Sequence, residues 1–134
     1  MAKRYEELEA WQLADELKRE VYALTETGPA AKDFKYRDQI RDSSASAPRN
    51  IAEGFGRFRP GEFARFLEFA VGSIDETRNS LIDGRDRGYL DATLFSRLFN
   101  LANAARRATR NLLLEKRRQA KADRNRGDDD PSPH

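Results

Sequence analysis

The sequence of 134 residues contains no cysteine and a single histidine, His134, at its last position. The absence of cysteine excludes thiolate zinc sites, iron–sulfur clusters, disulfides and thiol nucleophiles, and the place of the histidine argues against imidazole catalysis. Apolar stretches are short, so we expect neither a membrane-spanning helix nor the apolar region of a secretory signal peptide. The resulting expectation is a cytoplasmic protein that uses no metal and no other cofactor.

Neither sign of charge dominates the whole chain, because 25 Lys and Arg residues face 23 Asp and Glu residues, for a net charge of +2. This balance hides a gradient along the sequence. Residues 1–26 carry a net charge of −3, residues 27–96 are neutral, and residues 97–126 contain ten basic and two acidic side chains, a net charge of +8. The chain is long enough for one domain with its own core, and the basic segment indicates an anionic partner.

Turns that contain glycine or proline divide the sequence into four long segments with helical periodicity. Apolar residues recur every three to four positions over about residues 5–26, 34–55, 60–87 and 92–120, and no segment alternates long enough to form a strand. We therefore predict an all-α protein, an antiparallel up-down four-helix bundle over residues 1–120, followed by a disordered polar tail over residues 121–134. Asp91 is predicted to cap the last helix, and Pro48 either kinks the second helix or starts a new one.

Some apolar residues lie off the faces that are expected to form the core. Trp11 lies on a second stripe of the first segment, and Phe69 and Gly72 lie away from the main stripe of the third. A second apolar stripe predicts a contact between subunits, and the alternative for Trp11 is a partly exposed ring that leans on a neighbouring loop. A glycine inside a helix costs about 1 kcal/mol relative to alanine unless something packs against it.

A polar stripe accompanies the most distinctive motif, which runs from Ser46 to Arg57. On a helical wheel, Gln39, Ser46, Asn50, Glu53 and Arg57 fall on one line apart from the apolar face. This line predicts either a hydrogen-bond network or a polar surface between subunits. A catalytic interpretation makes Glu53 a general base beside Arg57, but no nucleophile, metal set or second carboxylate accompanies it. We therefore predict no catalytic residue and no enzyme activity.

The loop between the second and third predicted helices interleaves arginine, phenylalanine and glycine from Gly54 to Gly61. Such a loop, placed before a helix N-terminus, could hold a phosphate or stack a base. The alternative is a helix–helix turn whose phenylalanines complete the core, since glycine and proline are what any turn requires.

The basic residues of the last predicted helix are the main candidates for a binding surface. Contacts to backbone phosphates are predicted for Arg106, Arg110, Lys116, Arg117, Arg118 and Lys121. No groove-reading motif is present, so recognition would be of backbone or shape. The alternatives are a solvated helix face, whose cations are favoured near the helix C-terminus, or pairing with acidic side chains of the first helix.

An ordered set of residues between about 5 and 115 matches a known pattern. It comprises Leu8 to Trp11, Gln39 to Arg41, Ser46 to Arg57, Glu62-Phe63, Phe66-Leu67, Ala70 to Ser73, Glu76 and Gly88-Tyr89. With these residues the chain resembles a bacterial four-helix-bundle family named after open reading frames in intervening sequences of 23S ribosomal RNA genes. Ala47, Asp42 and Gly28-Pro29 depart from the family pattern, and Asp42 weakens a nucleic-acid surface at the start of the second helix.

The resemblance implies a small cytosolic up-down bundle that assembles as a ring-like homopentamer, and it supplies no catalytic residues. A similar bundle and pentamer occur in accessory proteins of diversity-generating retroelements, which bind a reverse transcriptase and nucleic acid. A pentamer would use Trp11, Phe69 and Gly72 as contacts and would repeat the basic segment around one axis.

The residues and the resemblance together predict a non-enzymatic homo-oligomer that binds nucleic acid, with RNA as the first candidate, through its basic C-terminal helix. The alternative is a protein–protein scaffold or an accessory subunit of a nucleic-acid enzyme that does not itself bind nucleic acid. No membrane partner is expected.

Overall fold

The computed structural model describes residues 1–129, and residues 130–134 of the predicted polar tail lie outside the described residues. The regular structure in this range is entirely helical, as the sequence predicts. In chain order the elements are η1 (Tyr5–Glu7), α1 (Glu9–Leu24), α2 (Gly28–Lys32), α3 (Phe34–Phe55), α4 (Pro60–Asp86) and α5 (Ala92–Asp129). Within the described range, none of these helices combines the length and the apolar character needed to cross a bilayer.

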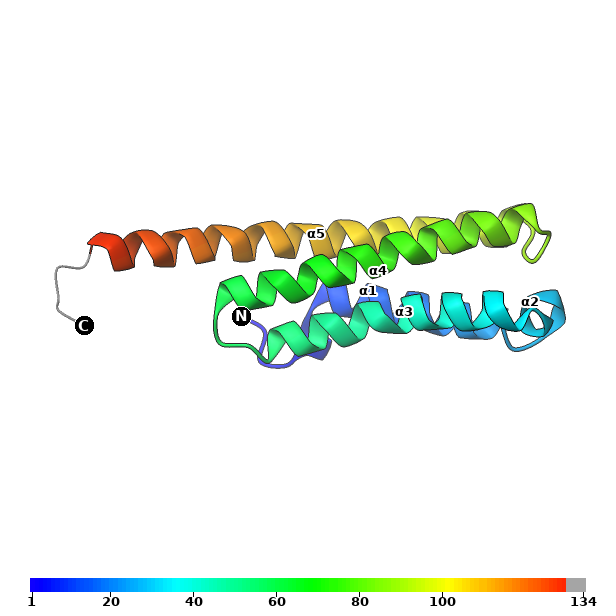
Figure 1. Cartoon of the computed structure of the whole chain (residues 1–134), viewed down its shortest axis with the longest axis horizontal. Coiled ribbons are helices and arrows are strands. Elements are labelled where there is room, and N and C mark those ends of the chain that lie inside the picture. Colours follow the sequence, from blue (N-terminus) through cyan, green and yellow to red (C-terminus); the bar gives the residue numbers. More distant parts are fainter. Residues whose placement is uncertain (130–134) are drawn as a thin grey trace.

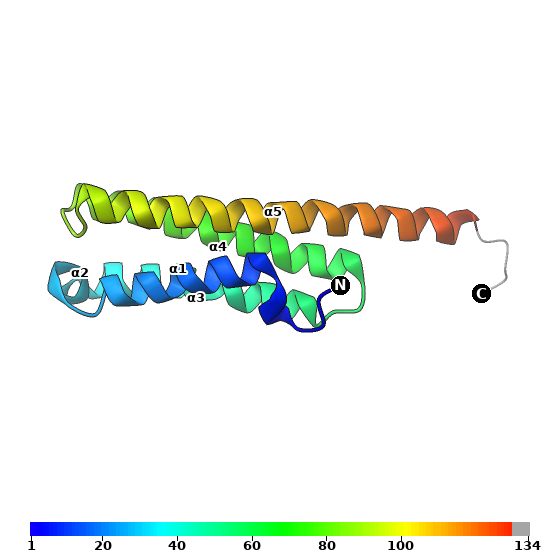
Figure 2. The same cartoon turned by 180° about the vertical axis from the view of Figure 1, so that it is seen from behind.

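The four long helices lie along one axis, and each runs opposite to the long helix before it (Figure 1). α1 packs against α3 and α5, and α4 packs against the same two helices. The pair α3 and α4 is nearer the viewer in Figure 1, and the pair α1 and α5 is nearer in the reverse view of Figure 2. This packing is compatible with the predicted antiparallel up-down bundle.

The core consists of the apolar helix faces that the periodicity predicts. Its fully buried members include Ala14, Leu17, Val21, Ile40, Ile51, Leu67, Ile74, Leu81, Leu98 and Ala102. Small and hydroxyl-bearing residues bring α3 and α4 close together. A Cβ atom on Gly54 would lie 2.8 Å from Cδ1 of Phe63, and the hydroxyls of Ser43 and Thr77 form a buried hydrogen bond of 2.8 Å. The seam between α3 and α4 therefore needs small side chains at these positions.

Local signals set some of the helix boundaries. The carboxylate of Asp91 accepts a hydrogen bond of 2.8 Å from the backbone N–H of Leu94, which confirms the predicted cap of α5. α3 continues through Pro48 without a new start, because the helix extends from Phe34 to Phe55. The short helix α2 replaces a predicted turn: Gly28 enters it with a φ of +76°, and Pro29 occupies its first turn.

The end of the last helix differs from the prediction. α5 continues to Asp129, so residues 121–129 are helical where the composition predicts a disordered tail. Residues 114–124 are mostly Leu, Glu, Lys, Arg, Gln and Ala, which are strong helix formers. A helix that the core has already nucleated can continue through such residues without an apolar face of its own. The boundary at residue 120 is therefore corrected to Asp129 for the helix.

Candidate nucleic-acid interface

The C-terminal part of α5, residues 114–127, is here named the basic extension. It contains six basic and two acidic side chains, and it follows Leu113, the last buried residue within residues 1–127. α5 has 38 residues, which corresponds to about 57 Å, and its end projects past the loop between α3 and α4 (Figure 1). Every residue of the basic extension is exposed or half-buried. The fold thus presents a cationic helix to solvent.

Arg106 ties α5 to α4 and is not an open phosphate ligand. Its Nε donates to Asp75 at 2.7 Å, and Asp75 also accepts a hydrogen bond of 3.1 Å from Arg78. Arg78 in turn donates to Asn103 at 2.8 Å and lies 5.1 Å from the ring centre of Phe99. Burial alone would raise the pKa of Asp75, but the hydrogen bonds from Arg106 and Arg78 outweigh it and hold this pKa below its usual value.

Two further predicted phosphate ligands are engaged within the chain. Arg117 donates to Glu68 of α4 at 2.6 Å. The Lys116 ammonium lies 5.3 Å from the ring centre of Phe63 and donates to Gln119 at 3.2 Å. Both residues hold the first part of the basic extension against α4, and a phosphate would have to compete with these contacts.

Arg110, Arg118 and Lys121 remain open. All three are exposed and form no hydrogen bond or ion pair within residues 1–127. Arg110 and Lys121 are eleven residues apart, which returns to nearly the same direction at 3.6 residues per turn, and Arg118 lies beside them. These three cations share the outward side of α5.

The polar stripe on α3 has two separate parts. Asn50 donates to the backbone carbonyl of Ser46 at 2.9 Å and to its hydroxyl at 3.0 Å, and Ser73 of α4 donates to the same hydroxyl at 2.8 Å. Asn50 therefore belongs to a polar seam between two helices. Gln39, at the other end of α3, is exposed and borders a small hollow with Asp33 and other residues.

Glu53, in the last turn of α3, and Arg57, in the loop that follows this helix, form an exposed ion pair of 2.7 Å. The Arg57 guanidinium also lies 4.8 Å from the ring centre of Phe66, which fixes it against α4. Among the described residues, no group of three or more acidic or histidine side chains is placed to hold a metal ion. The pair therefore acts as a link between the end of α3 and the start of α4.

Trp11 borders a groove between α1 and α3 with a volume of about 490 Å³. Its ring is half-buried and packs edge-to-face on Tyr5 of η1, with 5.3 Å between ring centres. This is the contact with a neighbouring segment that the second interpretation of Trp11 predicts. The groove also includes Tyr22, Pro48 and Glu53, so one wall of it is aromatic and part of its rim is charged.

Phe69 and Gly72 lie on the outer face of α4. The Phe69 side chain is 47% exposed and packs edge-to-face on Phe66, with 5.9 Å between ring centres. A Cβ atom on Gly72 would meet nothing within 4 Å. Nothing in the described chain explains the helix-weakening glycine, so its position is compatible with the predicted contact between subunits.

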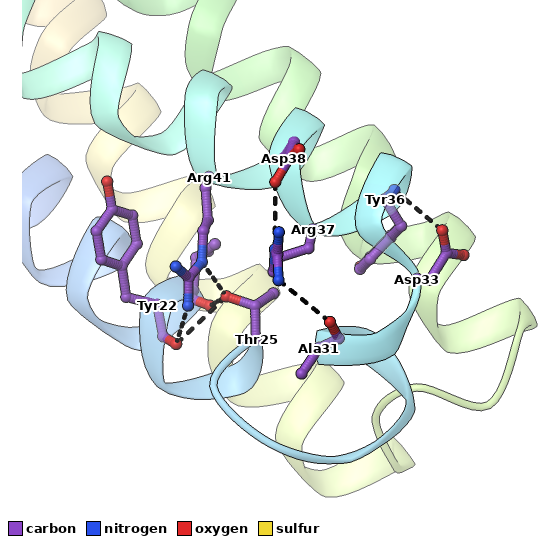
Figure 3. Close-up of polar contacts among 9 residues, drawn as sticks. Tyr22, Thr25, Ala31, Asp33, Tyr36, Arg37, Asp38 and Arg41 are labelled. Carbon is purple, nitrogen blue, oxygen red and sulfur yellow. Dashed lines mark hydrogen bonds and ion pairs between the residues drawn. The ribbon is translucent and has the colours of Figure 1, made fainter.

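Arg41 caps the C-terminal end of α1, as Figure 3 shows. The sequence analysis does not predict this interaction. Arg41 of α3 donates to the hydroxyl of buried Thr25 at 2.7 Å and to the carbonyl of Tyr22 at 3.4 Å. Its guanidinium also lies 4.9 Å from the ring centre of Tyr22. The positive charge thus meets the negative end of the α1 dipole. In the sequence, Arg41 stands out only as part of the Gln39 to Arg41 motif. Its contact with α1 could not be predicted, because it depends on how two helices pack.

A side-chain network closes the same end of the molecule and is also absent from the sequence prediction. The Tyr89 hydroxyl donates to Asp33 at 2.6 Å, and Arg87 donates to the same oxygen at 3.2 Å. The hydrogen bond from Tyr89 is the main cause that lowers the pKa of Asp33. Burial raises the pKa of Tyr36 to about 12, and its hydroxyl donates to the carbonyl of Ser80 at 2.9 Å. The capping rule could have identified Asp33, because it directly precedes the first residue of α3.

Comparison with known proteins gives one family. The model of the 23S rRNA-intervening sequence protein family matches residues 6–111, which is most of the chain and reaches all four long helices. No curated protein matches the chain. The match ends before the basic extension begins, so the extension lies outside the matched residues. The chain belongs to the 23S rRNA-intervening sequence protein family.

Proposed function

We propose that the protein is a non-enzymatic four-helix bundle that binds nucleic acid through the outward side of α5. RNA is the first candidate for this nucleic acid. The observation that carries the proposal is the set of three open cations, Arg110, Arg118 and Lys121, on a helix that projects from the packed part of the chain. Arginine and lysine on an exposed surface bind phosphates by charge and release condensed counterions as they do so.

The proposed contacts are to phosphates rather than to base edges in a groove. Several arginines of α5 are held by acidic partners, such as Arg106 by Asp75, and these set the position of the helix. The open cations then contact the ligand. Such a surface predicts binding with little sequence preference and a strong dependence on salt.

The experiment compares two charge-reversal variants with equal changes in net charge. Arg118→Glu combined with Lys121→Glu removes two open cations of α5, and Lys32→Glu combined with Lys35→Glu removes two lysines in α2 and at the start of α3. Fluorescence anisotropy with a labelled, unstructured RNA of about 12 nucleotides measures the affinity at fixed salt. The α5 variant should bind at least tenfold more weakly, and the control should lose much less. Equal losses in both variants would contradict a localised site.

We also propose that the protein is a homo-oligomer, with the pentamer of the family resemblance as the expected assembly. The exposed ring of Phe69, the bare backbone at Gly72 and the aromatic groove at Trp11 support contacts to other chains. Native mass spectrometry from moderate salt, without nuclease treatment, measures the copy number. Five copies of the 15.4 kDa chain support the proposal, and a bare monomer contradicts it.

A protein–protein scaffold is the second candidate function, and the groove at Trp11 is the observation that favours it. On this account the aromatic wall of the groove, and not the α5 cations, holds the partner. Trp11→Ala would then abolish partner binding, and RNA affinity would be absent in the wild type as well as in the variant.

A further inference from the structure

Phe58 is the most exposed internal side chain of the described apolar residues, with a relative exposure of 103%. It lies in the loop between α3 and α4, between Arg57 and Arg59. A large apolar ring in full contact with water is unfavourable unless a partner covers it in use. The loop ends the packed part of the rod on the side where α5 projects (Figure 1).

Other exposed aromatic rings have partners within the chain, and this sets Phe58 apart. Phe34 lies under Arg37 at 4.8 Å, Phe69 packs on Phe66 at 5.9 Å, and Tyr22 lies under Arg41 at 4.9 Å. Within residues 1–127, Phe58 has no such aromatic or cationic partner. Both of its faces are therefore available to a planar ligand group.

The surroundings of Phe58 carry positive charge from two elements. Arg59, the next residue, lines a hollow of about 480 Å³ between the start of α4 and α5, and Arg124 of the basic extension lines the other side. Two acidic residues, Glu62 and Asp123, also border this hollow, and Asp123 is paired with Arg126. Arg59 and Arg124 form no ion pair within residues 1–127, so two open guanidinium groups face one unpaired carboxylate.

We propose that Phe58 stacks on an unpaired base of single-stranded RNA, while Arg59 and Arg124 contact the phosphates beside that base. This inference rests on the proposed function and adds the substrate class to it. A ring that stacks needs a base with an open face, which single strands offer and the interior of a duplex does not. Arg59 and Arg124 favour this ligand over an apolar surface of another protein. Hydrogen bonds to phosphates offset the cost of desolvating a guanidinium group, and an apolar surface cannot form them. The protein therefore prefers single-stranded RNA to duplex RNA.

The experiment measures anisotropy with three probes that share one sequence of about 12 nucleotides: a single strand, a hairpin duplex, and a single strand that carries abasic sites. Phe58→Ala should weaken binding of the single strand about tenfold and leave the affinities for the duplex and the abasic strand unchanged. Phe58→Tyr keeps the ring and should bind the single strand within about twofold of the wild type. Phe34→Ala is the matched control, because Phe34 is also exposed but lies at the opposite end of α3.

Each other outcome has a definite meaning. If the wild type binds RNA but Phe58→Ala binds the single strand equally well, the inference fails and the proposed function stands. The inference also fails if Phe58→Ala leaves RNA affinity unchanged but alters the mass of the assembly, because the ring then contacts another chain. If the wild type binds none of the probes, the proposed function itself fails. Phe58 packs against no core residue, so its variants should unfold at the wild-type urea concentration, which checks that they are folded.

Discussion

Gly84 of α4 offers the sharpest test of the packing at the end of the molecule where Tyr36 and Tyr89 lie. A Cβ atom at this position would lie 2.9 Å from Cζ of Tyr36 and 3.0 Å from Cδ2 of Leu90, and closer still to the Tyr36 hydroxyl. That hydroxyl donates to the carbonyl of Ser80 at 2.9 Å, so the ring cannot move without loss of a hydrogen bond. The substitution Gly84→Ala forces either the ring or the helix to shift.

The expected cost follows from three contributions. Overpacking of a well-filled core costs about 1–3 kcal/mol. Loss of the Tyr36–Ser80 hydrogen bond adds about 0.5–1.5 kcal/mol, and the better helix propensity of alanine returns about 1 kcal/mol. Gly84→Ala should therefore lower the free energy of unfolding by about 2 kcal/mol, although alanine is the better helix former.

Urea unfolding followed by circular dichroism, at one protein concentration for all variants, measures this change. Tyr36→Phe removes the hydroxyl that the new methyl group would meet. In that background Gly84→Ala should cost about 1 kcal/mol less than in the wild type, which a double-mutant cycle detects. A neutral or stabilising Gly84→Ala, or additive effects of the two substitutions, would refute this account of the packing.

Three further predictions concern the ends and the outer surface of the bundle. Tyr89→Phe removes the main cause of the lowered pKa of Asp33, so an NMR titration should place that pKa higher than in the wild type. Asp33 contributes stability that is present above its unfolded pKa and lost as the pH falls through its folded pKa, so the cost of Tyr89→Phe should shrink in acid. Tyr36, with its pKa raised from 10.0 to about 12, should ionise near pH 12 in an absorbance titration. The stability that it contributes should be full below pH 10 and lost as the pH rises toward 12. Trp11→Ala should reduce assembly in native mass spectra and leave RNA affinity unchanged, and unchanged assembly would remove Trp11 from the interface.

The sequence predicts the helical class and the buried faces because both depend on local periodicity. Leu17, Leu67 and Leu98 lie in three of the segments with helical periodicity, and each is fully buried. Asp91 caps α5 as predicted, because a cap is a contact within four residues of the chain. Such features need no knowledge of how the helices pack.

The sequence could not predict in the same way which basic side chains form ion pairs within the chain. Arg106 and Arg117 look like open cations in the sequence, but Asp75 and Glu68 of α4 neutralise them across a helix–helix contact. The length of α5 escapes prediction for another reason. Its C-terminal part has helix propensity without an apolar face, and an apolar face is what the periodicity detects.

The central claim, that the open cations of α5 bind RNA phosphates, is tested most directly by the salt dependence of binding. For the wild type and both charge-reversal variants, the logarithm of the association constant for the single-stranded probe is plotted against the logarithm of salt concentration. Each phosphate contact to a single strand contributes about 0.7 to the slope, so Arg118→Glu with Lys121→Glu should flatten it by about 1.4. Lys32→Glu with Lys35→Glu should leave the wild-type slope in place. A slope that is the same in all three proteins would contradict the account.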